Sequence, residues 1–109
     1  MELVERIYAV TGRFPAHEQF GLVTQMRRAA VSVVSNIAEG AARAGSQDKA
    51  QFFVVARASL SELDTQAELS HRLRFMDETS AREIKAAMGE VSYLLQGLIT
   101  TQRAKGVRA

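Results

Sequence analysis

Cysteine is absent from the 109 residues, and proline occurs once. Without cysteine the chain can form neither disulfide bonds nor thiolate metal sites, which is compatible with a reducing intracellular compartment. A single proline leaves long helices uninterrupted, and no segment alternates apolar and polar residues as a half-buried strand does. No apolar run approaches the ~20 residues that span a bilayer, and Glu2 and Glu5 argue against a secretory signal. The sequence therefore predicts a soluble, cytoplasmic, all-α protein.

Charge is nearly balanced over the whole chain but not along it. The formal net charge is +2, whereas the last nine residues contain Arg103, Lys105 and Arg108 and no acid. The composition, 47% hydrophobic and 24% charged, is that of an ordinary folded domain. We expect one domain over residues 1–102 and a flexible basic tail over residues 103–109. Such a tail suits nucleic acid or an acidic partner, although a solvated terminus has the same composition.

Glycine and proline mark the first two helices. The first is expected over residues 3–11, followed by Gly12, which is placed to end it. Pro15 disfavours helix at the residue before it and suits the first turn of a new helix. The second helix is therefore predicted from about residue 16 to about residue 42.

Capping residues mark the third and fourth helices. The third is expected over residues 46–75 with Ser46 as its cap, and the fourth after the capping-box pattern Ser80-Ala-Arg-Glu83. Short connections make neighbouring helices antiparallel, so the pattern predicts an antiparallel up-down four-helix bundle. The apolar stripes of the three long helices are Leu22, Met26, Ala30, Val33 and Ile37; Phe52, Ala56, Leu60, Leu63 and Ala67; and Ile84, Ala87, Met88, Val91, Leu94, Leu95 and Leu98.

The first helix is too short for this bundle. At 1.5 Å per residue it spans ~14 Å, whereas the other three span ~30–40 Å. Because this helix is short, part of the apolar surface of the other three stays uncovered. Either the true start lies upstream of Met1, or another subunit covers the gap, and the expected product is an oligomer.

A polar ribbon runs beside the apolar stripe of the second helix and is matched by polar positions on the third. A surface helix needs only one apolar stripe, so the ribbon suggests polar groups that meet partners across an interface. Because buried charges persist only when paired, we expect Arg28 and Glu39 to find partners in Glu62 and Arg57, and Gly40 to serve close packing. The structural ribbon comprises Gln25, Arg28, Ser32, Asn36, Glu39, Arg57, Ser59 and Glu62, with Gln66 beyond them.

Catalytic chemistry finds little support. Glu39 and Glu62 are the only carboxylates expected to face inward, and no histidine lies on either ribbon. The pattern Glu68-x-x-His71 is typical of di-iron bundles but occurs once, where such a site needs it twice. We therefore expect no catalytic, metal or cofactor site.

Several motifs together resemble a known bacterial family. They are Phe14-Pro15, Gln25-Met-Arg-Arg-Ala-Ala-Val-Ser32, Ser35-Asn-Ile-Ala-Glu-Gly40, Phe52, Ala56-Arg57, Ser59-Leu60 and Glu62-Leu63. The family is that of the four-helix-bundle proteins first noticed as reading frames inside intervening sequences of 23S ribosomal RNA genes. The resemblance covers residues 14–73 strongly and the fourth helix by pattern alone.

The resemblance implies an antiparallel four-helix bundle that assembles as a ring, with a homopentamer as the expected form. It also implies similarity to the accessory proteins of diversity-generating retroelements, which are basic pentamers that work with a reverse transcriptase and its RNA. The sequence departs from the family in its short first helix, in Val34 where proline is common, and in Ala41-Ala-Arg43 where an aromatic often precedes the arginine.

Two interpretations of function stay open: a scaffold that binds RNA or an RNA-handling protein, and a protein-binding adaptor with no nucleic-acid role. In the second interpretation the cations are solvated surface charge. Antiparallel topology places the tail beside the turn that carries Arg43 and Lys49, which could form one basic patch per subunit. The candidate nucleic-acid-binding residues are Arg27, Arg43, Lys49, Arg72, Arg74, Arg103, Lys105 and Arg108.

Overall fold

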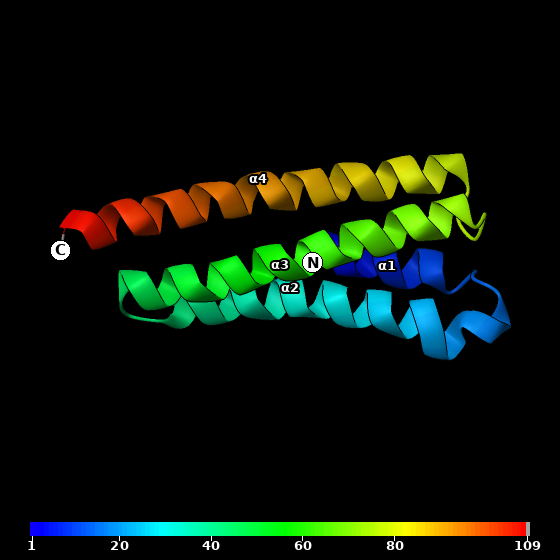
Figure 1. Cartoon of the computed structure of the whole chain (residues 1–109), viewed down its shortest axis with the longest axis horizontal. Helices are drawn as coiled ribbons and strands as arrows, with labels where there is room; N and C mark the ends of the chain where they lie inside the picture. The colour runs from blue at the N-terminus through cyan, green and yellow to red at the C-terminus, as the bar shows by residue number, and fades with distance from the viewer. Residues whose placement is uncertain (109) are drawn as a thin grey trace.

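The computed structural model describes residues 1–108, without the side chain of Arg108. Over these residues the chain is all-α, as predicted, with four α-helices and no strand. The helices are α1 (Glu2–Thr11), α2 (Thr24–Ala42), α3 (Ser46–Arg72) and α4 (Glu78–Arg108). They run alternately up and down in an elongated bundle of 51 × 23 × 19 Å (Figure 1).

The connection between α1 and α2 differs from the prediction of a regular helix from residue 16. It contains a 3-10 turn, η1 (Ala16–Glu18), and a π-helical turn, η2 (Gln19–Val23). Gly21 has a non-helical backbone, with φ −111° and ψ −108°. The carboxylate of Glu18 accepts a hydrogen bond from the Leu22 amide at 3.3 Å, so a side chain supplies the partner that a regular turn would supply. Regular α-helix therefore begins only at Thr24.

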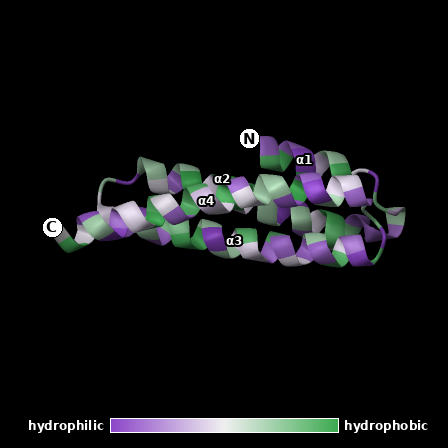
Figure 2. Ribbon diagram, turned by 90° about the horizontal axis from the view of Figure 1, so that it is seen from above, coloured by the Kyte–Doolittle hydropathy of each residue, from purple (hydrophilic) through white to green (hydrophobic). Residues whose placement is uncertain are grey.

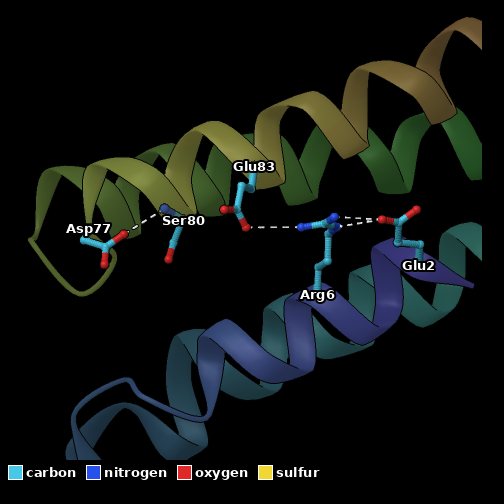
Figure 3. A network of polar contacts seen from close by, with 5 residues as sticks. All are labelled: Glu2, Arg6, Asp77, Ser80 and Glu83. Carbon is cyan, nitrogen blue, oxygen red and sulfur yellow. Dashed lines mark hydrogen bonds and ion pairs between the residues drawn. The ribbon is translucent and has the colours of Figure 1, made fainter.

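The predicted start signals of α3 and α4 were wrong in detail. Gly45, not Ser46, is the N-cap of α3, and no side chain caps this helix. At α4, Oδ1 of Asp77 accepts a hydrogen bond from the Ser80 amide at 2.7 Å (Figure 3). Asp77 therefore takes the capping role that the sequence pattern gave to Ser80, because an acid three residues before Ser80 reaches the same free amide.

α3 ends at Arg72, three residues before the predicted end. The Arg74 amide donates to the His71 carbonyl and the Phe75 amide donates to the Ser70 carbonyl, each at 3.0 Å. This pair of bonds is the Schellman motif, in which the residue after the C-cap takes a left-handed backbone. Arg74 is that residue, with φ 65°.

The core confirms most of the predicted stripes. Met26, Ala30, Val33, Leu63 and Leu95 are each completely buried. Leu94 is the one predicted stripe member that is exposed, and four others are half-buried: Leu22, Ile37, Phe52 and Leu98. On α3 and α4 the next residue is buried in place of the predicted one, Phe53 beside Phe52 and Ile99 beside Leu98.

Gly40 serves close packing, as predicted. A Cβ atom placed on it would lie 2.6 Å from Cε1 of Phe53 and 3.2 Å from the backbone oxygen of Lys49. The absence of a side chain lets α2 approach the start of α3 closely beside their connecting turn.

α1 covers only part of the bundle. It packs against α2 and α4 (Figures 1 and 2), and it begins near the middle of the long axis. No described helix lies beside the other half of that α2–α4 side. On α4 beyond α1, the stripe residue Leu94 is left 45% exposed.

Candidate subunit and nucleic-acid interfaces

Part of the polar ribbon joins α2 to α3. The Ser32 and Ser59 hydroxyl oxygens lie 2.8 Å apart, and Nδ2 of Asn36 donates to the Ser32 carbonyl at 2.8 Å and to its hydroxyl at 3.2 Å. All three side chains are half-buried. These three residues therefore form a small hydrogen-bonded cluster between the two helices.

The charged members of the ribbon lie at the surface of the subunit, which corrects the expectation of buried pairs. Glu39 pairs with Arg43 at 3.3 Å, one turn along the same helix, and Glu62 accepts a hydrogen bond from Gln66 at 3.1 Å. Arg28 and Arg57 are exposed, and in the described part of the chain neither makes a hydrogen bond or ion pair. The ribbon follows the outer edge of the α2–α3 contact, so its charged side chains reach water. Gln25 is exposed as well.

Arg27 fixes α1 to α2 and is not free for a ligand. Its Nε donates to the hydroxyl of Thr11 at 2.9 Å, and one terminal nitrogen donates to the Tyr8 carbonyl at 3.2 Å. The guanidinium carbon lies 4.5 Å from the centre of the Tyr8 ring, a cation–π distance. The sequence assigned Arg27 to nucleic acid, and the structure gives it a packing role.

α1 is also tied to α4 by an arginine that sequence reasoning missed. Arg6 donates to Glu2 on its own helix at 2.8 Å and to Glu83 on α4 at 3.2 Å (Figure 3). The carboxylate of Glu2, followed by that of Glu83, raises the pKa of Arg6. The only sequence signal for this contact is the Glu2–Arg6 spacing of four residues.

Three more predicted cations are engaged within the subunit. Arg43 lies 3.8 Å from Asp48 and stacks over the Phe52 ring at 4.6 Å, in addition to its pair with Glu39. Nζ of Lys49 donates to the Ala41 carbonyl at 2.9 Å and so satisfies the end of α2. Arg72 pairs with Glu68 at 3.0 Å.

The predicted tail is a continuation of α4, because this helix runs to Arg108 instead of ending at residue 102. No glycine turn or proline interrupts it there. Its last turns lie beside the start of α3, where Arg103 and Val107 line a groove of about 540 Å³ with Gln47 and Gln51. The tail thus lies beside the α2–α3 turn, as antiparallel topology predicted, and Lys105 is exposed there. The side chain of Arg108 and all of Ala109 lie outside the described residues.

The opposite end of the bundle brings together residues from both of its connections. Arg13, between α1 and η1, and Arg74, between α3 and α4, line one cavity of about 550 Å³ with His71 and Phe75. Arg74 was among the candidates predicted from the sequence, whereas Arg13 was not. Arg13 lines this cavity because two connections that are distant in sequence meet in the fold. The sequence around Arg13 therefore carries no local signal for this role.

Among residues 1–107 no cluster of three acidic, histidine or cysteine side chains has a geometry that could hold a metal ion. The two members of the Glu68-x-x-His71 pattern have separate partners, since Glu68 pairs with Arg72 and His71 lies 3.1 Å from Glu78. None of the described helices has the length and hydropathy required to cross a membrane.

The fold and its polar surfaces define a class of small antiparallel helical bundles whose first helix is shorter than the other three. The chain belongs to the family described as 23S rRNA-intervening sequence protein, whose family model matches residues 1–97. The predicted resemblance to this family is thereby confirmed.

A solved structure shows the same fold. It is the crystal structure of a protein of unknown function from the S23 ribosomal protein family of Bacteroides thetaiotaomicron VPI-5482. The TM-score is 0.81 at 24% sequence identity, over 90% of this chain and 92% of that one. No curated protein matches the sequence.

Proposed function

We propose that this chain is a non-enzymatic, homo-oligomeric scaffold that binds RNA or an RNA-handling protein through basic surface patches. The observation that carries the proposal is the uncovered half of the α2–α4 side, because it gives one subunit an unfinished surface. The proposal has two separable parts, assembly and RNA binding.

Assembly is supported by the chemistry of α4 beyond α1. The twelve residues from Val91 to Gln102 include no charged side chain, although Tyr93, Leu94, Gly97 and Thr101 among them are exposed. An exposed helix of a monomer normally alternates charge with its apolar stripe. A contiguous uncharged surface of this kind is typical of a protein–protein contact. We infer that a second copy covers it, in a ring whose preferred number of subunits, from the family resemblance, is five.

RNA binding is supported by the basic end of α4. Arg103 and Lys105 lie on its last turns with no acid within the final nine residues, and Arg108 follows. A closed ring would repeat this small charge at each subunit and so produce a larger patch. The resemblance to the accessory proteins of diversity-generating retroelements, which work with RNA, points in the same direction.

Light scattering tests the assembly. The wild-type protein should have a mass several times 12.0 kDa at micromolar concentration. Leu94→Glu should reduce that mass, because it places a charge in the uncharged surface. Thr65→Glu, at an exposed position on α3, is the control and should leave the mass unchanged. A 12.0 kDa wild-type monomer would contradict the assembly.

Salt-dependent binding tests the RNA part. Replacing Arg103, Lys105 and Arg108 with alanine should weaken binding to all RNA sequences. It should also flatten the log–log salt slope by roughly 0.7–0.9 for each phosphate that is no longer neutralised. The fold and the mass should not change. No RNA binding by the wild type at ~50 mM salt, where screening is weak, would refute this part.

The second candidate is a protein-binding adaptor, and the uncharged surface of α4 favours it. Most of the other predicted cations have partners inside the subunit, so the free positive charge is smaller than the sequence suggested. An assembled protein that binds no RNA in the experiment above would support this candidate.

A further inference from the structure

The end of the bundle opposite to the C-terminus of α4 carries both the α1–α2 and the α3–α4 connections (Figure 1). Its cavity of about 550 Å³ is lined by Arg13 from the first connection and by Arg74, Phe75 and Asp77 from the second. This cavity belongs neither to the ribbon nor to the basic end of α4.

Arg74 occupies a backbone position that normally selects glycine. Its φ of 65° is left-handed, and side chains other than asparagine and aspartate rarely take this conformation. The Schellman motif would form at least as well with glycine there. The arginine is exposed, and within residues 1–107 its side chain makes no hydrogen bond or ion pair. A left-handed backbone at an arginine whose side chain has no internal partner is the kind of outlier that points to a ligand.

The acids at this end are already engaged, whereas the arginines are not. Glu18 accepts from the Leu22 amide, Asp77 from the Ser80 amide, and Glu78 lies 3.1 Å from Nε2 of His71. The bond from Ser80 is the main cause of the lowered pKa of Asp77, and the nearby charge of Arg13 is a smaller one. The side chains of Arg13 and Arg74 make no hydrogen bond within the described part of the chain. Among the described residues, Arg13 and Arg74 are therefore the charged donors at this end that are left without a hydrogen-bond partner.

An aromatic ring is exposed to solvent at the same end. Phe20 in η2 is 95% exposed, although it is one of only five phenylalanines. Gly21 sets the backbone that presents it, and a Cβ there would lie 2.9 Å from the capping oxygen of Glu18. The same connection contacts the cavity wall, because His17 packs edge-on against Phe75 with ring centres 6.1 Å apart.

We propose that this end of the bundle binds a single-stranded polynucleotide, with phosphates on Arg13 and Arg74 and a base stacked on Phe20. Arginine side chains and an exposed aromatic face are the two elements that single-strand binding needs. An acidic peptide would use the arginines but would leave the ring unused. This inference rests on the proposed RNA-binding function and adds a contact at the end that the tail does not reach.

Arg74→Gly separates binding from folding. The affinity for a 20-nucleotide oligouridylate RNA should fall roughly fivefold to tenfold, and the salt slope should decrease by about 0.7. The melting temperature should rise or stay unchanged, because glycine takes the left-handed backbone freely. Arg13→Ala should weaken binding similarly. Lys85→Ala, an exposed charge on α4 outside this cavity, is the control and should change the affinity less than twofold.

Phe20→Trp reports on stacking, because the chain has no tryptophan of its own. Oligouridylate should quench the indole fluorescence of this variant, whereas polyglutamate of equal charge should not. Thr65→Trp, at an exposed position on α3 outside both this cavity and the uncharged surface of α4, is the control and should not respond. An unchanged Phe20→Trp signal at saturating RNA would overturn the proposal. Equal quenching and competition by polyglutamate would also overturn it and would indicate an acidic protein partner.

The two nucleic-acid proposals fail in different ways. If the triple tail variant loses RNA binding while Arg74→Gly keeps it, RNA binding stands and the end site is refuted. If the reverse holds, the tail is not the contact and the end site stands. If the wild type binds no RNA at ~50 mM salt, both are refuted.

Discussion

The two halves of the bundle share the same long helices and differ in whether α1 covers them. Ala87 and Leu94 lie on one stripe of α4, seven residues and thus two turns apart. Ala87 is 9% exposed in the half that α1 covers, whereas Leu94 is 45% exposed in the half that it does not. Coverage by α1, more than the apolar stripe of α4 itself, therefore decides whether a residue of this stripe is buried.

The covered half is also fixed by polar contacts that the open half lacks. Arg27 joins α1 to α2, and Arg6 joins α1 to α4. In the open half the described polar contacts lie between α2 and α3, as in the hydrogen bond from Lys49 to the Ala41 carbonyl. One half is a closed four-helix core, and the other is a three-helix layer with one side available.

The largest expected effect comes from matched isoleucines. Ile7 is 0% exposed in the covered half and Ile99 is 2% exposed in the open half. Ile7→Ala should reduce the free energy of unfolding by about 2–5 kcal/mol. In a monomer Ile99→Ala should cost less, because a thinner layer collapses more easily around a cavity. Urea denaturation measures both. If Ile99→Ala reduces the free energy of unfolding as much as Ile7→Ala does, and this loss grows with protein concentration, another subunit closes the open half.

Adjacent arginines give the second comparison. Arg27→Ala should cost about 1.5–3 kcal/mol, because it removes charged hydrogen bonds that join α1 to α2. Arg28→Ala, one residue later and exposed, should lie within about 0.5 kcal/mol of wild type. Hydrogen exchange should show faster opening of α1 only in the Arg27 variant. Similar effects of the two substitutions would contradict the assigned roles.

The ribbon gives smaller effects. Asn36→Leu should cost about 1 kcal/mol by removing its hydrogen bonds to Ser32. Glu39→Ala should cost only about 0.2–0.5 kcal/mol, because its pair with Arg43 lies at the surface. Thermal unfolding of the subunit measures both. If Glu39→Ala instead dissociates an oligomer, the ribbon contacts a neighbouring subunit.

The smallest effect concerns pH and the cap of α4. The folded-state pKa of Asp77 is lowered by its hydrogen bond from Ser80. Its contribution to stability is therefore present above the ordinary carboxyl pKa of about 3.9 and is lost as pH falls through the lower folded value. The melting temperature of Asp77→Asn should fall less than that of wild type between pH 5 and pH 2, because asparagine still caps and does not titrate. Identical pH profiles would show that the bond contributes nothing.

Helices and their buried faces could be predicted because they depend on local spacing. Met26, Ala30 and Val33 repeat at helical intervals, and the core follows them. Caps were less predictable, since Asp77 and Ser80 both fit a helix start and only geometry shows which oxygen reaches the free amide. In η2, a hydrogen bond to the Glu18 carboxylate and one glycine outweigh helical propensity.

Sites formed by contacts between distant segments could not be predicted from the sequence. Arg27 was a plausible surface cation until the register of α1 brought Thr11 and Tyr8 beside it. Arg13 and Arg74 lie sixty-one positions apart, and only the antiparallel topology places them in one cavity. Charge counts along the chain say nothing about which cations already have internal partners.

The short α1 has an electrical consequence for the two ends of the bundle. Each helix terminus carries roughly half an elementary charge, positive at the N-terminus and negative at the C-terminus. The end with Arg13 and Arg74 gathers two N-termini and two C-termini, whose partial charges cancel. The other end gathers the C-termini of α2 and α4 and the N-terminus of α3, because α1 begins halfway along (Figure 1). That end carries a net half negative charge from the backbone, which offsets part of the attraction of Arg103 and Lys105 for a polyanion.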